Sequence, residues 1–507
     1  MGPLLAERFA ARAAERPHDL AVADAGGGTA YGALAAQAEA VARALAGRRR
    51  IAILPRAEAA SLAVVLGAMT AGVSVVLVDR HLTAAQAERV LAVAAPELVV
   101  TAGRHPRPLL ERVAPERVVT PAGLAGGERG ARDERDTGDV RVGGVPGTGD
   151  VGGEAAQRRA RPGDELLVGL TSGTSGTPKL FVRDQASWAT TLDRSDATFD
   201  VRPGDVVSAA GPLDHSHFFY GALHALTRGA AVDLRPLATA FGDGHAITHV
   251  YLVPTLAVDL VALLGERPRE HVREVMSSAA PWPRQARERL ARLLPAATVT
   301  HFYGASELSF VARDSSRTPP PAHGAHRLFD GVEVEVRGLD GAPLPDGEQG
   351  EVHVRSDMLF SGYLTPAGLA GGPDADGWLT VGDLGTLRDG WLSLAGRGSE
   401  TIVSGGFNVE PAHVELALAG LPGVRDAACV GLPDERWGAL PVAVLVLDGV
   451  AAPTRAQVRE HVRAALPQPS RPRRVFVADE LPRNARGKLL RPRLAALVAA
   501  GELAELG

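Results

Sequence analysis

Two lysines stand out in a chain whose other strongly basic residues are all arginine. Lysine and arginine together number 54 among the 507 residues, and only Lys179 and Lys488 are lysines. Arginine carries a planar fork that is always charged, whereas lysine carries a compact ammonium on a flexible stem that can reach one oxygen between two anionic groups. The two lysines therefore indicate places where a point charge meets phosphate or carboxylate oxygens. Chance survival in an arginine-rich composition is the alternative.

The first lysine closes a loop rich in glycine and hydroxyl groups. Thr171-Ser-Gly-Thr-Ser-Gly-Thr-Pro-Lys179 follows an apolar run, residues 166–170, that is typical of a buried strand. Glycines let successive backbone N–H groups turn toward one point, and hydroxyls add donors, which suits phosphate oxygens. Pro178 stands where a Walker A loop needs glycine, so this is not that motif. We predict a phosphate-binding loop of another kind, with a Ser/Gly linker as the alternative.

Four further motifs follow in order along the chain. They are Tyr303-Gly-Ala-Ser-Glu307, Gly382-Asp383-Leu384, Gly396-Arg397 and the run from Pro482 to Lys488, PRNARGK. With the Thr171 loop, this set resembles the adenylate-forming superfamily, which contains acyl-CoA synthetases, peptide-synthetase adenylation domains and luciferases. The resemblance covers nearly the whole chain except residues 123–163.

The resemblance implies which residues carry the activation of a carboxylic acid by ATP. Glu307 is expected to hold Mg²⁺ against the phosphates, because a carboxylate is the hard oxygen ligand that this ion prefers. Lys488 is expected to lie between the α-phosphate and the attacking carboxylate, and Lys179 to assist the pyrophosphate side. The residues implied in catalysis are Lys488, Glu307 and Thr171. Those implied in nucleotide binding are Ser172, Gly173, Thr174, Ser175, Gly176, Thr177, Lys179, Ala279, Tyr303, Gly304, Ser306, Asp383 and Arg397.

A second half-reaction is also implied by the resemblance. In the family the C-terminal domain rotates after the adenylate forms, withdrawing the lysine and presenting a glycine loop, here Gly405 and Gly406, to a thiol tunnel. Relatives carry an acidic residue or lysine at the hinge, where this chain has Ser399. Relatives often have paired glycines in the segment that here reads Ser277-Ser-Ala-Ala, and the larger side chains predict an altered substrate shape.

The acyl pocket is expected along the segment from Gly211 to Gly221. His215 occupies the position where amino-acid-activating domains place an amine-binding aspartate, so it argues against an α-amino acid. Asp214 could still bind an amine, which keeps an amino or β-amino acid open. Aromatic side chains suggest an apolar wall for a fatty or bulky acid, although ordinary core packing is the alternative, and packing is the favoured interpretation of His217 and His224. The predicted pocket residues are His215, Phe219, Ser278 and Trp282.

Apolar runs alternating with helical periodicity predict an α/β fold. We expect a large N-terminal ATP- and acyl-binding domain over residues 1–397, with layered α/β subdomains and a small β-rich subdomain. A small mobile α+β domain over residues 398–507 is expected to act as a lid. Residues 123–163 contain almost no large apolar side chain, which predicts a flexible insertion.

The composition of the chain limits the kinds of partner that it is expected to bind. The net charge is −5, hydrophobic residues make up 45% of the chain, and no basic run suggests nucleic acid or a membrane surface. The single cysteine and the lack of a signal peptide or an 18-residue apolar run favour a cytoplasmic protein. The predicted function is an acyl-CoA synthetase that uses ATP, Mg²⁺ and coenzyme A on a small carboxylic acid. Loading of a discrete acyl carrier protein is the alternative, and a nucleotide-binding protein without catalysis is a weaker one. The oligomeric state stays open.

Overall fold

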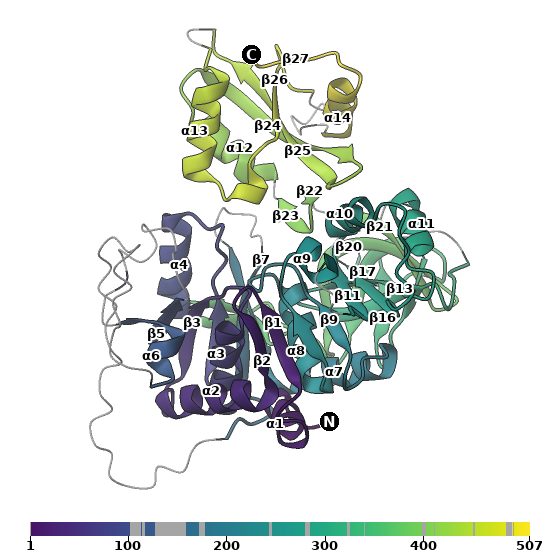
Figure 1. The fold of residues 1–507 in the computed structure, drawn as a ribbon. Helices are drawn as coiled ribbons and strands as arrows, with labels where there is room; N and C mark the ends of the chain where they lie inside the picture. The colour runs from purple at the N-terminus through teal and green to yellow at the C-terminus, as the bar shows by residue number, and fades with distance from the viewer. Residues whose placement is uncertain are drawn as a thin grey trace.

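The computed structural model divides into a large N-terminal body and a small C-terminal domain (Figure 1). It describes residues 2–101, 113, 117–126, 159–171, 178–242, 246–278, 284–321, 325–338, 340–397, 402–409, 411–449, 452–482, 489 and 491–507. Two sheets build the body and a third builds the C-terminal domain.

The eight-stranded sheet of the body has a parallel centre. Its order is β19 (Gly368–Ala370), β18 (Gly362–Thr365), β8 (Lys179–Asp184), β7 (Glu165–Thr171), β4 (Ser74–Leu77), β3 (Arg50–Leu54), β5 (Leu98–Thr101) and β6 (Val118–Val119). Every residue of β3, β4 and β5 is buried. Parallel strands are covered on both faces and therefore consist of continuous apolar runs, which is why these short segments could be recognised from the sequence.

The thirteen-stranded sheet joins a parallel half to an antiparallel half. Its order is β16 (Glu333–Arg337), β17 (Gln349–Arg355), β20 (Trp378–Arg388), β21 (Trp391–Arg397), β15 (Ala325–Leu328), β14 (Ser309–Ser315), β13 (Thr298–Ala305), β12 (Glu274–Ser277), β11 (His249–Leu252), β9 (Val206–Ser208), β10 (Ala231–Asp233), β1 (Leu20–Asp24) and β2 (Gly27–Ala30). At its antiparallel end β16 and β17 form a hairpin, in which Val334 pairs with Val354. The β-rich part is the antiparallel end of this sheet.

Helices cover both sheets of the body. They are α1 (Leu5–Glu15), α2 (Tyr31–Ala44), α3 (Ala59–Thr70), α4 (Ala84–Ala94), α6 (Pro121–Leu124), α7 (Gln185–Thr198), α8 (Ser216–Arg228), α9 (Leu237–Gly242), α10 (Pro254–Leu264) and α11 (Arg284–Leu293). The helices α7 and α8 matter most for function, because α7 follows β8 directly and α8 contacts the parallel strands β9, β10 and β11. Side chains of both helices line the cavity that lies between the two sheets.

The C-terminal domain has its own sheet and two apolar clusters. The sheet order is β23 (Phe407–Val409), β22 (Ile402–Ser404), β25 (Gly438–Leu447), β26 (Arg474–Val477) and β27 (Ala504–Glu505), with β24 (Val424–Asp434) also paired to β25. The helices are α12 (Pro411–Ala419), α13 (Arg455–Ala465) and α14 (Arg491–Ala499), with a short 3₁₀ turn, η2 (Gln468–Ser470). In Figure 1 the hairpin β22–β23 faces the N-terminal body, and α14 lies at the opposite end of the domain.

The predicted α/β architecture is confirmed. The domain boundary after residue 397 stays a prediction, as does the flexible insertion at 123–163, because residues 127–158 lie outside the described part of the chain.

A close approach of α2 and α3 provides a test of the packing. Gly67 of α3 lies so near α2 that a Cβ atom there would be 2.5 Å from the carbonyl oxygen of Ala38 and 2.7 Å from the Cβ of Val41. We expect Gly67→Ala to lower the free energy of unfolding by about 1–3 kcal/mol through overpacking, measured by urea denaturation. Gly242→Ala is the matched control, since no atom lies within 4 Å of the added methyl group. Equal stability of the two variants would contradict this packing.

Candidate active site

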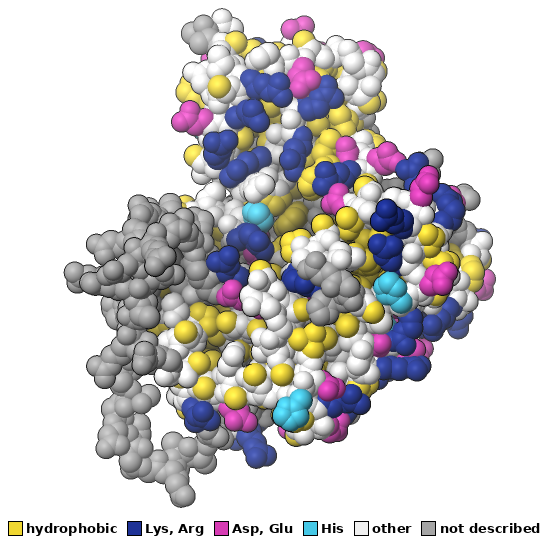
Figure 2. Space-filling model, in the orientation of Figure 1, with side chains coloured by type: hydrophobic (Ala, Val, Ile, Leu, Met, Phe, Trp, Pro, Cys, Tyr) yellow, Lys and Arg dark blue, Asp and Glu magenta, His cyan; other side chains and the backbone are white. Residues whose placement is uncertain are grey.

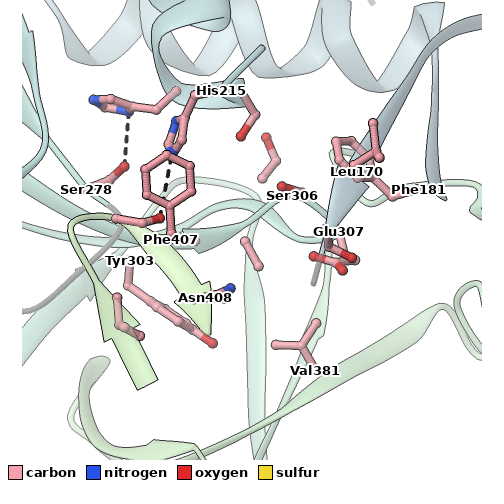
Figure 3. Close-up of a pocket in the computed structure, with 18 of the residues that line it drawn as sticks. Leu170, Phe181, His215, Ser278, Tyr303, Ser306, Glu307, Val381, Phe407 and Asn408 are labelled. Carbon is pink, nitrogen blue, oxygen red and sulfur yellow. Dashed lines mark hydrogen bonds between the residues drawn. The ribbon is translucent and has the colours of Figure 1, made fainter. Parts of the chain in front are cut away.

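A cavity of about 1350 Å³ opens where the two sheets of the body meet the C-terminal domain. Its walls come from strands β7 and β8 of one sheet, β13, β14 and β20 of the other, helices α7 and α8, and the hairpin β22–β23. This exceeds the range of about 300–1,000 Å³ of ordinary ligand pockets, so it can hold more than one small molecule. Figure 3 shows part of its lining.

The ends of the predicted phosphate loop face this cavity. Thr171 ends β7, Lys179 begins β8, and the two residues pair across the antiparallel register. Both line the cavity. The six residues between them that were predicted to bind phosphate, 172–177, lie outside the described residues.

Glu307 lies beside this loop, although it comes from the other sheet. It follows β13 and is 8% exposed, and its Oε1 atom accepts a 2.8 Å hydrogen bond from the hydroxyl of Tyr363. The Tyr363 ring in turn carries the Lys179 ammonium 5.0 Å from its centroid. One tyrosine thus links the cation of one sheet to the carboxylate of the other.

Tyr303 and Asp383 lie in contact in the lining of the cavity. The Tyr303 hydroxyl donates a 2.6 Å hydrogen bond to Oδ2 of Asp383, and Asp383 is 6% exposed. Gly304 and Ser306 line the cavity next to them. Arg397 pairs with Asp383 in the strand register of β20 and β21, although its side chain is not described.

Gly304 is required by the backbone around it. A Cβ atom at this position would lie 2.0 Å from the carbonyl oxygen of Ser309, so only glycine fits. Ser309 itself has φ of 61°, in the left-handed region that side chains seldom adopt. Strain of this kind is retained where the surroundings enforce it, and it is concentrated at functional sites.

Histidines form the wall opposite Tyr303. Nδ1 of His217 lies 3.0 Å from the Ser278 hydroxyl, and Nε2 of His215 lies 3.5 Å from the carbonyl oxygen of Gly406 (Figure 3). Burial lowers the pKa of His215 and lowers that of His217 to about 3. Both rings are therefore neutral at physiological pH and add polarity to the wall without adding positive charge.

The structure corrects two interpretations of helix α8. His217 lines the cavity, so its role is more than the helix packing that the sequence favoured. Phe219 does not line it: this ring is fully buried and packs edge-on against Trp188. At 100° per residue, His217 and Tyr220 share the face toward the cavity, and Phe219 does not. His224 is a packing residue, bonded to Tyr251 and Asp196.

Asp214 has a partner already. Its carboxylate accepts hydrogen bonds from the backbone N–H and the guanidinium of Arg80, at 3.0 and 3.1 Å. This ion pair offers no free carboxylate for a substrate amine. Trp282, predicted for the acyl pocket, and Ala279, predicted to bind nucleotide, lie outside the described residues.

The C-terminal domain closes the cavity with its first hairpin. Gly406, Phe407 and Asn408 line the cavity, and the Phe407 ring stands edge-on to His81 and His215 of the body. Gly405 donates its N–H to the Trp437 carbonyl within the domain. Lys488 and Ser399 lie outside the described residues. Leu489 packs into an apolar cluster of the C-terminal domain that also includes Leu494 and Val498 of α14, and it does not line the cavity.

Sequence reasoning missed Arg183, His217 and Phe407 as cavity residues. Arg183 is one arginine among fifty-two and follows no motif, whereas the helical period from His217 to Tyr220 was visible. The described part of the chain contains no cluster of three or more His, Cys, Asp or Glu side chains arranged to hold a metal ion. None of the helices in that part is both long and apolar enough to span a membrane.

The fold and the site define an adenylate-forming enzyme. The profile of the AMP-binding enzyme family matches residues 9–364, and that of the AMP-binding enzyme C-terminal domain matches residues 413–488. The chain therefore belongs to the AMP-binding enzyme family. The uncharacterized acyl-CoA ligase YhfT of Bacillus subtilis (strain 168) is 32% identical over 455 residues, covering 88% of this chain and 87% of that protein.

Solved structures extend the likeness to both domains. The amide bond synthetase McbA from Marinactinospora thermotolerans matches with a TM-score of 0.81 at 26% identity, covering 97% of this chain and 99% of the other. A malonyl-CoA ligase with methylmalonyl-CoA and AMP bound matches with a TM-score of 0.73 at 30% identity, covering 92% and 96%. The chain is thus similar over both domains to an amide bond synthetase and to a malonyl-CoA ligase.

The contacts of Phe407 give a test of the domain arrangement. Aromatic pairs contribute about 0.5–1.5 kcal/mol each, so we expect Phe407→Ala to populate other orientations of the C-terminal domain. The measurement is the distance distribution between spin labels at Arg89→Cys and Arg459→Cys, both at exposed positions. Cys429 is buried and its pKa is raised by desolvation, so it escapes labelling.

The expected result is a broader distribution in the Phe407→Ala variant. Leu369→Ala serves as the control, because this leucine is 53% exposed on β19. Identical distributions for Phe407→Ala and the parent would show that the hairpin does not hold the domain.

Proposed function

We propose that this acyl-CoA ligase relative first joins a carboxylic acid to AMP and then passes the acyl group to the thiol of coenzyme A. The observation that carries the proposal is the convergence of Thr171, Lys179, Tyr303, Glu307 and Asp383 from two sheets on one cavity that the C-terminal hairpin closes. In the first step a carboxylate oxygen forms a bond to the α-phosphorus of ATP, and pyrophosphate leaves. In the second, the thiol sulfur bonds to the acyl carbon and AMP leaves.

Charge stabilisation is the main requirement of the first step, because two anions must meet. Lys179, at the end of the phosphate loop, is suited to the pyrophosphate side. Lys488 is proposed to supply the charge between the α-phosphate and the carboxylate once the C-terminal domain brings it to the cavity. Tyr303 offers its ring to adenine, while Asp383 can accept hydrogen bonds from the ribose hydroxyls.

Glu307 fits the proposed Mg²⁺ ion. Its buried carboxylate faces the cavity beside Thr171, and Tyr363 occupies only one of its oxygens. Mg²⁺ is usually held by one or two protein carboxylates plus substrate phosphates, which agrees with a single acidic ligand here. The ion would neutralise charge on the phosphates, and Glu307 would hold it on the pyrophosphate side.

The domain orientation suits the second step. Gly406 lines the cavity, whereas Leu489, next to Lys488 in the sequence, packs into an apolar cluster of the C-terminal domain with residues of α14 and does not line it. We propose that this is the thioester-forming orientation and that the domain rotates for adenylation. Neutral His215 would then border the path of the thiol.

Arginines on the C-terminal domain favour coenzyme A as the acceptor. Figure 2 shows Lys and Arg side chains gathered on the visible face of this domain. In the same domain Arg436 and Arg473 place their guanidinium groups over the ring of Trp437, and the Trp437 carbonyl accepts a hydrogen bond from the N–H of Gly405. Cations next to the glycine loop suit the phosphates of coenzyme A.

Two other acceptors are compatible with the fold. A discrete acyl carrier protein would present the same thiol on a protein surface. An amine acceptor is suggested by the similarity to McbA, an amide bond synthetase. If the adenylate is consumed only when a carrier protein or an amine is present, that acceptor would replace coenzyme A in the proposal. The first step would remain intact.

Lys488 gives the sharpest test of the two steps. We expect Lys488→Ala to slow adenylate formation by about 10²–10³-fold, because a charge at the reacting centre is lost, while thioester formation from supplied acyl-adenylate is retained. Single-turnover assays measure each step separately. Lys488→Arg should not restore the first step if a compact charge is required. Arg486→Ala, in the same segment, is the control, and a Lys488→Ala enzyme with normal adenylation would refute the role.

The metal assignment is tested at Glu307. We expect Glu307→Gln to raise the Mg²⁺ concentration for half-maximal ATP–pyrophosphate exchange by about tenfold or more, because a neutral amide is a weaker ligand. Glu335→Gln is the matched control: this glutamate accepts a hydrogen bond from Arg337, and neither of the two residues lines the cavity. Unchanged Mg²⁺ dependence in Glu307→Gln would place the ion elsewhere.

A further inference from the structure

Arg183 is a buried cation on the wall of the cavity that none of the proposed steps uses. It lies on β8, where Lys179, Phe181 and Arg183 share one face, because side chains alternate along a strand. All three line the cavity, whereas Leu180 and Val182 pack into a cluster on the other face. The Arg183 residue is only 5% exposed. Its long side chain therefore ends inside the protein at the cavity wall.

Helix α7 fixes the guanidinium in place. Nε donates to the Ser187 hydroxyl and Nη2 to the Thr191 hydroxyl, each at 3.1 Å. Thr191 is held in turn by the Ser309 hydroxyl at 3.0 Å, and Ser309 has the left-handed backbone noted above. Nη1 makes no hydrogen bond to any described residue and is not among the fully enclosed polar atoms that lack a partner. We infer that Nη1 is the edge of the fork that is open to the cavity.

The guanidinium has no carboxylate partner among the described residues. No acidic side chain in the described part of the chain forms an ion pair with it. The adjacent Asp184 is on the opposite strand face and caps α7, where it accepts from the Ser187 N–H at 2.7 Å. Burial lowers the pKa of Arg183 to about 10, so the side chain stays cationic at neutral pH. A buried charge without a counter-ion is costly, and an anionic ligand would offset that cost.

The position of Arg183 separates it from the phosphates. Lys179 and Arg183 are the only Lys or Arg among the described residues that line the cavity. They are four residues apart on one strand, which at about 3.3 Å per residue puts their Cα atoms roughly 13 Å apart. Lys179 stands at the phosphate loop. Arg183 lies deeper, next to Trp188 and Tyr220, and Nε1 of Trp188 is also buried there without an acceptor among the described residues.

We propose that Arg183 binds a second carboxylate, carried at the end of the acid substrate remote from the carboxylate that is activated. The substrate class is then a dicarboxylic acid whose apolar middle lies along the aromatic wall. A hydrogen bond from Nη1 to that carboxylate is short and strong because both groups are charged, and it also fixes the direction in which the acid enters. This inference rests on the proposed function, since it names the acid for the same cavity.

The test compares diacids with monoacids of equal length. Thioester formation with ATP, Mg²⁺ and coenzyme A is measured for straight-chain monoacids and α,ω-diacids of six to ten carbons, together with the monomethyl esters of the diacids. In the parent enzyme we expect the best diacid to exceed its monoacid and its monomethyl ester in kcat/KM. Arg183→Met should lower the ratio of the two kcat/KM values by about 10–100-fold, the range for a lost hydrogen bond to a charged group. Arg183→Lys should retain part of the preference.

Controls separate binding from folding. Replacing a buried unpaired charge by an apolar side chain of similar length is often neutral or stabilising, so we expect no fall in Tm for Arg183→Met. Arg313→Met is the matched change at a partly buried arginine of β14 that packs on Phe329 and does not line the cavity. It should leave the diacid-to-monoacid ratio within about twofold of the parent.

The outcomes distinguish this inference from the function on which it rests. Monoacids activated at least as well as diacids, with a ratio that Arg183→Met does not change, would overturn the second-carboxylate site and leave the ligase activity standing. A parent enzyme that forms neither adenylate nor thioester from any acid of the series would overturn both. A ratio that falls equally in Arg183→Met and Arg313→Met would assign the effect to general packing and also overturn the site.

Discussion

Repulsion between a carboxylate and a triphosphate is the constraint on which the cavity depends. The described lining contains six carboxylates, from Asp79, Asp214, Glu307, Asp383, Asp434 and Glu435, but only two strongly basic side chains. The histidines do not add to these, because burial lowers the pKa of His217 and His301 to about 3 and keeps their rings neutral. Each of these two positive charges therefore matters for holding anionic groups in the cavity. Lys488, on the C-terminal domain, is proposed to supply a third. The acidic excess also makes entry of an anion without its metal and lysine partners unfavourable.

The fold places these groups at loops that follow strands. Thr171 ends β7 of one sheet, and Glu307 follows β13 of the other, and both strands have a parallel neighbour. In α/β sheets, ligands bind outside the carboxyl ends of parallel strands, where loops can carry polar groups. Two such sheet edges face the same cavity, one carrying the end of the phosphate loop and the other Glu307. Tyr363 connects the two edges, because its ring contacts Lys179 and its hydroxyl donates to Glu307. Closing that space with the β22–β23 hairpin lets one cavity serve two successive reactions.

Much of this could be predicted from the sequence, for identifiable reasons. The buried strands are continuous apolar runs, from which the α/β class followed. Thr171 ends β7 and Glu307 follows β13, whereas Asp383 lies within β20, so only part of the site stands at strand ends. The directions in which individual side chains point were harder to predict from the sequence. Phe219 was assigned to the pocket although Tyr220, one helical step on, is the residue that lines it. Arg183 carries no local signal, because its proposed importance arises from the lack of a carboxylate partner among the residues that the structure describes.

The central claim is that the carboxylate attacks the α-phosphorus of ATP in this cavity. The most direct test of it is to follow the transfer of an oxygen atom from the acid to AMP. Mono- and diacids labelled with ¹⁸O in both carboxylate oxygens are incubated with the enzyme, ATP, Mg²⁺ and coenzyme A, and the nucleotide product is analysed by mass spectrometry. The account predicts AMP that carries one ¹⁸O atom, formed together with acyl-CoA. Unlabelled AMP, or ADP in its place, would contradict it.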